Sequence, residues 1–465
     1  MGVIKPMVRG VEAAGAVLVV TMLVAGTLLA AVVASETKLV PIDGAPGDLF
    51  GSAVGNSVAP SGRTAVIGAH GDDDGGDRAG AVYIFHDDGT GWAEQAKLTA
   101  SDGVPKDFFG LAVSISGDAV VVGSFFSDAP AEHSGSAYVY QRSGDTWIEE
   151  AKLVAADGAE GDLFGISVAI SGDALVVGAR DHDAVAPNSG AAYVFRYDKT
   201  GWTQEAELSA SDGAADDFLG VRVAIDGDVV IAGAPTADVG GGDSGAAYVF
   251  RFDGTSWTQE AKLTAPDGGT AGDRFGSSVA INGDTAVVGA PHEGPGGAAA
   301  KSPFAGFGGT ARGAAYVFRF DGTNWSHDTK LIPSDPKPKT RSGGSVSISS
   351  DKIQEAKLVP IDLSPMSQFG GSVSISGDKI VVGTSRGDGG ERDTGAAYVF
   401  QRTGTVWSGE LKLLASDGEQ GDGFGGSVSI LQDTVFVGAA GDDDLGSAAG
   451  ATYVYELTSS WDEPN

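Results

Sequence analysis

The sequence predicts an all-β fold, a single β-propeller made of four-stranded blades. Three observations predict it: a pattern that recurs along the chain, alternating apolar and polar residues within each copy, and glycine-rich turns between them. Glycine accounts for 73 of 465 residues and charged residues for only 20%, which suits short strands joined by many turns. No copy contains a helical pattern, so helical solenoids are excluded.

Each copy opens with a Phe-Gly or Leu-Gly pair that starts an alternating strand. A turn such as "SGD" at Ser171–Asp173 joins it to a second strand that ends in "GA" or a near relative. A loop of variable length follows, and then a third strand with "AYVF" or a variant. The opening pairs, usually spaced by 55 or 56 residues, begin at Phe50, Phe109, Phe164, Leu219, Phe275, Phe369 and Phe424.

The fourth strand of each copy begins at a tryptophan, after a hairpin of the "FDGTSW" type. By the period of two, Trp257, Gln259, Ala261 and Leu263 are expected to share one face and to pack on the neighbouring sheet. One such sheet cannot bury both of its faces, whereas radial stacking of the sheets does. The seven tryptophans, one for each copy, are Trp92, Trp147, Trp202, Trp257, Trp325, Trp407 and Trp461.

The two ends of the chain complement each other. The last copy stops after Trp461 without the "EAKL" that follows elsewhere, and "ETKLV" at Glu36–Val40 supplies that piece. We therefore predict that the last blade is assembled from both ends, with Thr37–Leu39 pairing beside Val454 and Tyr455. This pairing would close the ring and cover an exposed strand edge.

A truncated copy at residues 334–356 interrupts the pattern. Arg341–Ile353 nearly duplicates Gln368–Ile380, but the rest of its unit is missing. It is either the remnant of an eighth blade or a local duplication that bulges from a seven-bladed ring. Seven complete copies favour seven blades, and eight stay open.

The first 34 residues are predicted to direct export. Lys5 and Arg9 precede an uncharged apolar run from Ala13 to Ala34, the layout of a signal peptide cleaved after Ala34. The run is also long enough to remain as a membrane anchor. Residues 35–465 then form the propeller, whose first repeat-like residues begin at Glu36, and the protein is expected to be secreted or held at the cell surface.

Composition narrows the partners. The chain has 62 acidic and 30 basic side chains, a net charge of −32, which repels nucleic acid and anionic membrane surfaces. Membrane contact is expected only through residues 13–34, if they are not cleaved. The absence of cysteine excludes disulfides, thiol catalysis and a lipoprotein anchor.

These repeated motifs resemble the FG-GAP repeat family, which includes the N-terminal propellers of integrin α chains. The resemblance covers Glu36 to Trp461, and "GAP" is literal at Gly233–Pro235 and Gly289–Pro291. It implies a propeller with a binding function. Integrin repeats also carry calcium loops between the first and second strands, but "SGD" at Ser171–Asp173 offers too few oxygens for Ca²⁺. Those calcium sites therefore cannot be carried over.

The long loops are expected on one face of the propeller, because connections after the second and fourth strands of a meander lie at the same end. They include Gly71–Gly80, Gly441–Gly450 and the insert Pro291–Gly313, together with the "DGxxxDxFG" connections. Variable loops on a rigid scaffold often carry recognition, so this face is the predicted binding surface. The matching face of integrins also takes part in ligand binding.

One loop holds the candidate metal ligands Asp72, Asp74 and Asp77 around Gly75 and Gly76. Clustered carboxylates on a bending loop can bind Ca²⁺, but the bidentate glutamate of an EF-hand is missing. The alternative is a solvated acidic turn. Asp442 and Asp444 repeat the arrangement in the last copy.

Recurring aspartate pairs are interpreted as structural, accepting hydrogen bonds from backbone amides of their own turns. The "RGD" at Arg386–Asp388 is interpreted as a chance match in a chain rich in glycine and aspartate. The aspartate pairs are Asp43/Asp48, Asp102/Asp107, Asp157/Asp162, Asp212/Asp217 and Asp417/Asp422.

No catalytic residue is assigned from the sequence. The six histidines are scattered, without the short spacing of zinc ligands, and no HExxH or GxSxG motif is present. The leading hypothesis is an exported, non-enzymatic binding or adhesion module for a protein or glycan, assisted by Ca²⁺. The alternative is an extracellular hydrolase or lyase with a shallow site on the propeller axis, for which His70 and Arg180 are the candidates.

Overall fold

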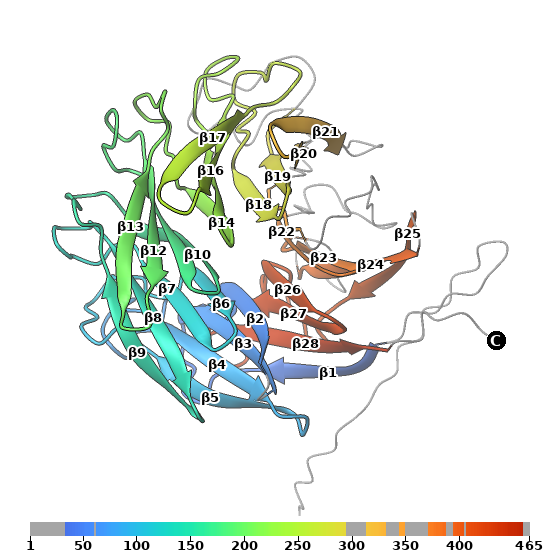
Figure 1. Cartoon of the computed structure of the whole chain (residues 1–465). Coiled ribbons are helices and arrows are strands. Elements are labelled where there is room, and N and C mark those ends of the chain that lie inside the picture. Colours follow the sequence, from blue (N-terminus) through green and yellow to red (C-terminus); the bar gives the residue numbers. More distant parts are fainter. Residues whose placement is uncertain are drawn as a thin grey trace, which may run out of the picture.

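The computed structural model describes residues 33–59, 62–293, 313–331, 344–348, 371–386, 394–403 and 406–458. These residues form seven four-stranded antiparallel sheets around a common axis, which is a seven-bladed β-propeller (Figure 1). The predicted fold class is thereby confirmed. Within the described part of the chain, the structure contains no helix that could cross a bilayer.

In each of the first four blades, consecutive strands pair in chain order. Blade 1 contains β2 (Ala53–Ala59), β3 (Gly62–Ala69), β4 (Ala81–Asp87) and β5 (Trp92–Leu98). Blade 2 contains β6 (Val113–Ser116), β7 (Ala119–Ser124), β8 (Ser136–Ser143) and β9 (Thr146–Leu153). Blade 3 contains β10 (Phe164–Ser171), β11 (Ala174–Ala179), β12 (Ala191–Tyr197) and β13 (Trp202–Leu208). Blade 4 contains β14 (Arg222–Asp226), β15 (Val229–Ala234), β16 (Ala246–Phe252) and β17 (Trp257–Leu263).

The last three blades follow the same order except at the closing strand. Blade 5 contains β18 (Ser278–Asn282), β19 (Thr285–Ala290), β20 (Ala314–Phe320) and β21 (Trp325–Leu331). Blade 6 contains β22 (Ser372–Ser376), β23 (Lys379–Thr384), β24 (Ala396–Thr403) and β25 (Val406–Leu413). Blade 7 contains β26 (Ser427–Leu431), β27 (Thr434–Ala439), β28 (Ala451–Leu457) and β1 (Val33–Leu39).

The ring closes as predicted, through pairing of the two ends of the chain. β1 runs antiparallel to β28, with Thr37 opposite Val454 and Lys38 opposite Tyr453 (Figure 1). β1 begins at Val33, opposite Leu457, three residues before Glu36. Residues 1–32, which hold most of the predicted export segment, lie outside the described residues, as does Trp461.

The Phe-Gly pair of each copy joins one blade to the next. Phe50 is fully buried, packs edge-on against Tyr83 at 5.5 Å between ring centroids, and bridges to Gly450 of blade 7. Leu219 takes the place of phenylalanine at one junction and bridges to Gly190. The backbones approach so closely that a Cβ on Gly450 would lie 2.1 Å from the Phe50 carbonyl oxygen. Because Gly450 also has a φ of +88°, only glycine suits this position.

The expectation that Trp257, Gln259, Ala261 and Leu263 share one face is wrong. A β-bulge separates the pairs Val249–Ala261 and Phe250–Gln259 and inserts one extra residue into β17. An extra residue shifts the alternation by one, so the side chains beyond it point to the opposite face of the sheet. Trp257 therefore packs toward blade 3, whereas Ala261 and Leu263 pack toward blade 5.

The described part of the truncated copy, residues 344–348, lies beside the inner strand of blade 6. The Ser345 hydroxyl accepts a hydrogen bond from the Val373 amide at 3.2 Å. Inner strands of neighbouring blades make the same kind of contact elsewhere, for example Ser374 with the Ile430 amide at 3.1 Å. The seven sheets of the described residues include no eighth blade, so the open alternative of eight is not realised there.

Candidate functional site

The long loops that the structure describes gather on one face, as predicted; most of the insert Pro291–Gly313, residues 294–312, lies outside the described residues. Apart from the connection into blade 6, which lies mostly outside the described residues, each connection that enters a blade hydrogen-bonds to the loop between the second and third strands of the preceding blade. The Lys106 amide donates to the Asp77 carbonyl at 2.8 Å, and the Gly47 amide donates to the Ser447 carbonyl at 2.9 Å. We call this the long-loop face. Among its segments are residues 40–52, 70–80, 99–112, 125–135, 154–163, 180–190, 209–221, 235–245, 264–277, 414–426 and 440–450.

A tyrosine on the third strand of each blade extends toward this face. In blades 1, 2, 3, 4 and 7 the tyrosine hydroxyl donates to an aspartate of the entering connection, as Tyr248 does to Asp212 at 2.9 Å. Burial raises the pKa of these tyrosines, so they stay neutral donors. In six of the seven blades the residue opposite the tyrosine on the fourth strand is lysine. The exception is Glu207 in blade 3, opposite Tyr193.

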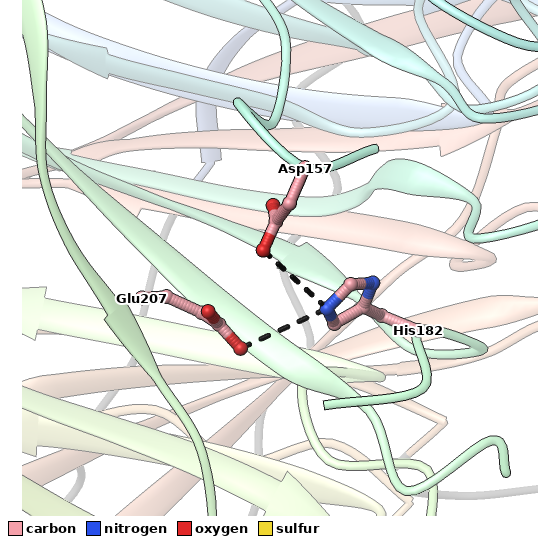
Figure 2. A group of neighbouring side chains, drawn as sticks. All are labelled: Asp157, His182 and Glu207. Atoms are coloured by element: carbon pink, nitrogen blue, oxygen red, sulfur yellow. Dashed lines mark ion pairs between the residues drawn. The ribbon is translucent and has the colours of Figure 1, made fainter. Parts of the chain in front are cut away.

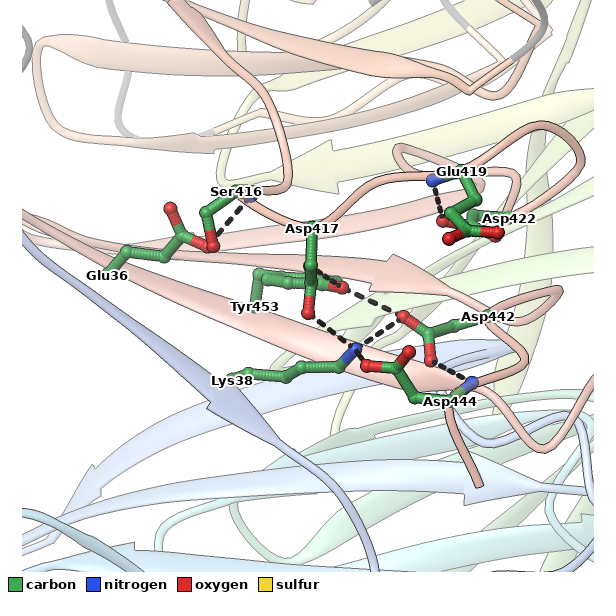
Figure 3. Close-up of polar contacts among 9 residues, drawn as sticks. All are labelled: Glu36, Lys38, Ser416, Asp417, Glu419, Asp422, Asp442, Asp444 and Tyr453. Carbon is green, nitrogen blue, oxygen red and sulfur yellow. Dashed lines mark hydrogen bonds and ion pairs between the residues drawn. The ribbon is translucent and has the colours of Figure 1, made fainter. Parts of the chain in front are cut away.

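In blade 7 this lysine is Lys38, at the centre of three aspartates (Figure 3). Its Nζ lies 2.9, 2.8 and 2.7 Å from carboxylate oxygens of Asp417, Asp442 and Asp444. Although burial lowers the pKa of Lys38, the hydrogen bonds to the three aspartates outweigh it and raise that pKa above its usual value. The Tyr453 hydroxyl donates to both Asp417 and Asp442. The ammonium is therefore the cation at the centre of an acidic cluster.

Two of the three predicted calcium ligands of blade 1, Asp72 and Asp74, lie in an equivalent cluster. Asp72 and Asp74 pair with the Lys97 Nζ at 2.8 and 2.6 Å, and Asp72 also accepts a hydrogen bond from the Tyr83 hydroxyl. Asp77 is exposed, and only its carbonyl enters the backbone network. Lys97 thus occupies the place beside Asp72 and Asp74 where a cation would bind. A calcium ion held by Asp72, Asp74 and Asp77 stays a prediction.

The aspartate pairs divide into two roles, of which the sequence indicated one. The second aspartate of each pair accepts a hydrogen bond from an amide of its own turn, as predicted, for example Asp48 from Ala45 at 2.7 Å. Burial, with the nearby Asp72 and Asp73 carboxylates, raises the pKa of Asp48 to about 6. The equivalent contacts are Asp107 from Val104, Asp162 from Ala159, Asp217 from Ala214 and Asp422 from Glu419.

The first aspartate of each pair has a role that the sequence analysis missed. It accepts the tyrosine hydroxyl and, where a lysine is present, the ammonium: Asp102 contacts Tyr138 at 2.7 Å and Lys152 at 2.6 Å. The sequence did contain a signal for this role. When the copies are aligned, a tyrosine recurs in the third strand and a lysine recurs in the fourth strand of nearly every copy.

Blade 3 reverses the charge of this cluster. Glu207 replaces the lysine, and His182 stands where blade 1 has Asp72. The His182 Nε2 lies 3.8 Å from the Asp157 Oδ2 and 3.7 Å from the Glu207 Oε1 (Figure 2). The hydrogen bond of its Nδ1 to Asp162, at 2.9 Å, raises the pKa of His182 despite burial. Among the described residues, this is the one group of three acidic or histidine side chains close enough to hold a metal ion.

The remaining predicted residues make local contacts in separate places. His70 contacts the Ser52 hydroxyl through Nδ1 at 2.9 Å in blade 1. Arg180, in the loop after β11, pairs with Asp181 at 2.8 Å and stacks over Phe218. The structure does not bring His70 and Arg180 together in one site. Of the "RGD" at Arg386–Asp388, only Arg386 belongs to the described residues.

Exposed apolar side chains mark the long-loop face. Of the six large hydrophobic residues that the described part of the chain exposes most, five are on loops of this face: Ile42, Val104, Val185, Val239 and Leu445. The sixth, Ile148, is on β9. A cavity of about 290 Å³ opens between loop 70–80 and the connection into blade 2, lined by Asp74, Lys97, Thr99 and Gly103 among others.

Comparison with known proteins identifies the repeat. The family model described as FG-GAP repeat matches the chain in seven segments, which together cover well over half of it. The first segment, residues 33–85, spans β1 to β4 and so contains one fourth strand followed by three strands of the next blade. A search of curated protein sequences returned no match. The seven segments are residues 33–85, 92–140, 147–195, 202–250, 257–318, 352–400 and 407–455.

Proposed function

The chain belongs to the FG-GAP repeat family, and from that premise we propose that it is an exported binding module that holds a protein or glycan on its long-loop face. The exposed apolar residues of this face are the observation that carries the proposal. Ile42 is 85% exposed and Val185 51% exposed, although both stand on loops held by backbone hydrogen bonds. Exposed apolar groups on a rigid surface lose unfavourable contact with water when a partner covers them.

The charges of the face support a selective partner. In blades 1, 2, 4, 5 and 7 a lysine pairs with an aspartate of the acidic cluster, so the exposed apolar residues share this face with paired charges instead of standing in a uniformly negative field. The cavity beside Lys97 and Thr99 can accept a single side chain or sugar ring between two loops. Such a mosaic favours a protein or glycan surface over a polyanion, because the net charge of −32 repels nucleic acid.

Export is part of the proposal and depends on the first 34 residues. Lys5 and Arg9 before the apolar run Ala13–Ala34 support a signal peptide or an anchor, which would place the propeller outside the cytoplasm. The proposed function is non-enzymatic. It requires only a preformed face, which the hydrogen bonds between successive loops provide.

The test is a glycan array and a pull-down from extracellular material, both with the exported protein. Ligands found with the wild type are then measured against a triple variant, Ile42→Ser, Val104→Ser and Leu445→Ser. We expect this variant to weaken binding at least about tenfold, because each exposed apolar contact typically contributes on the order of 1 kcal/mol. These side chains are exposed, so the fold should tolerate the changes.

Ile148→Ser is the matched control, since Ile148 is 55% exposed but lies on β9 away from the long-loop face. It should leave affinity unchanged. Equal loss of binding in the control and the triple variant would contradict the proposed surface. Turnover of a bound glycan or peptide would instead favour the alternative of an extracellular enzyme.

A further inference from the structure

The third blade lacks the cation that the same position supplies in the other blades. Lysine stands opposite the tyrosine everywhere except at Glu207, so the blade 3 cluster holds two carboxylates and no ammonium. We propose that a divalent transition-metal ion, such as Zn²⁺, binds between Asp157, His182 and Glu207 and takes the place of that ammonium. The proposal does not depend on the binding function above.

The geometry of the three side chains fits such an ion. One ligand atom from each residue lies within 4.8 Å of the others (Figure 2), and Glu207 stands where the other blades place the lysine. Zn²⁺ binds nitrogen and oxygen ligands at about 2.0 to 2.2 Å, so the three atoms need to approach one another slightly. Asp157 is 46% and Glu207 33% exposed at the side chain, which gives them room to move.

The surroundings orient the histidine as a ligand. Its Nδ1 bonds to Asp162, which leaves the Nε2 to face Asp157 and Glu207. A carboxylate behind a histidine is the arrangement that fixes ring orientation and raises ligand basicity in zinc sites. The His182 side chain is nine-tenths buried, yet its Nε2 is 3.7 Å or more from both carboxylates, too far for a hydrogen bond.

Asp157, one of the two carboxylate ligands, is also positioned by a hydrogen bond on the side away from the ion site. The Tyr193 hydroxyl donates to the Asp157 Oδ1 at 2.9 Å, which leaves Oδ2 directed toward His182. In blade 4 the equivalent Asp212 uses its Oδ2 for Lys262 Nζ at 2.6 Å and its Oδ1 for Tyr248. In both blades the tyrosine hydroxyl therefore binds one oxygen of this aspartate. The other oxygen faces the ammonium in blade 4 and His182 in blade 3.

The ligand set selects the kind of metal. One imidazole and two carboxylates suit zinc and its first-row neighbours, and three protein ligands leave a position for water. Calcium is disfavoured, because it prefers six to eight oxygen ligands and does not use imidazole. The site differs from the calcium prediction at Asp72, Asp74 and Asp77 in position and in metal.

The test is zinc titration of the chelator-treated, full exported chain against a competing chromophoric chelator. We expect one specific equivalent of Zn²⁺ in the wild type, and a rise in melting temperature on its addition. Glu207→Lys should weaken that site at least about 100-fold, since it removes a ligand and puts an ammonium in the cluster. This variant is expected to fold, because six blades already carry lysine there.

Two further variants separate the site from weak binding by surface histidines. His182→Ala should abolish the specific equivalent, and Lys262→Glu should create none, because blade 4 has Ala237 in place of the histidine. Cobalt substitution should give an absorption spectrum of low-symmetry Co²⁺ in the wild type alone. The same zinc stoichiometry and affinity in Glu207→Lys and the wild type would overturn the proposal, as would no specific equivalent in the wild type.

Discussion

Blades 3 and 7 place a tyrosine, an aspartate and a fourth-strand side chain in the same register, but with opposite central charge. In blade 7 the central group is Lys38, bound by three aspartates. In blade 3 it is Glu207, facing Asp157 and His182. The strands around them pair alike, Tyr453 with Lys38 and Tyr193 with Glu207.

The difference shows that the backbone determines the position of this cluster, whereas the side chain opposite the tyrosine determines its central charge. Strand pairing and the glycine-dependent contacts between blades use backbone atoms and do not involve the side chain of the central residue. The cluster also opens to solvent on one side, so a reversed charge is less costly than it would be in a dry core. The backbone contacts common to both blades form a shared frame, and the central residue is the part that differs.

The largest effect is expected from the shared frame, and it should be equal in both blades. Gly450→Ala and Gly190→Ala each place a Cβ 2.1 Å from a backbone carbonyl oxygen, at φ of +88° and +78°. We expect each to lower the free energy of unfolding by about 3 kcal/mol, from backbone strain and overpacking. Denaturant midpoints measure the loss.

Gly172→Ala is the control for these glycines. Gly172 has a φ of +60° in a hairpin, but no atom lies within 4 Å of the added Cβ. It should cost only about 1 kcal/mol. A cost as large as that of Gly450→Ala would mean that conformational strain, and not the contact between blades, decides the effect.

Next in size is charge reversal, which should have opposite signs in the two blades. Lys38→Glu leaves Asp417, Asp442 and Asp444 without a cation and adds a fourth carboxylate, at a cost of about 2 to 3 kcal/mol. Glu207→Lys gives Asp157 a partner and should be neutral or stabilising by up to about 1 kcal/mol. Urea unfolding in the presence of a chelator checks both, and changes of the same sign would refute the comparison.

The smallest effect concerns pH, in the cluster of blade 1 that resembles that of blade 7. Because the pKa of Asp48 is raised to about 6 by burial and by Asp72 and Asp73, the folded state takes up a proton there before the unfolded state does. Stability from this group is therefore greatest below pH 4 and is lost as the pH rises through 6.

Asp48→Asn removes that dependence while keeping an oxygen for the Ala45 amide. Between pH 7 and pH 4 the wild type should gain about 1 to 2 kcal/mol relative to the variant. Melting temperatures of both proteins across this range measure the difference. Parallel pH profiles would show that Asp48 does not titrate in this window.

The fold could be predicted in most respects because repetition reveals strand order and because both ends of the chain carry halves of one unit. The bulge in β17 could not be predicted, because the sequence of the strand does not show that Glu260 is an extra residue in the pairing. The extra residue changes only which face of the sheet each side chain occupies. The tyrosine clusters join residues far apart in the chain, as Tyr83 joins Asp43 and Asp72. Alignment of the copies would have singled out Glu207 and His182, but their proximity required the structure.

Ring closure through β1 has a mechanical consequence. Val33 lies opposite Leu457, so β1 begins and β28 ends at the same end of one antiparallel pair. Tension applied between Val33 and Leu457 would load the hydrogen bonds of β1 and β28 one after another, as in unzipping, and not all at once, as in shear. We expect the seam to open at a low force and to let the other blades remain folded while β1 is detached.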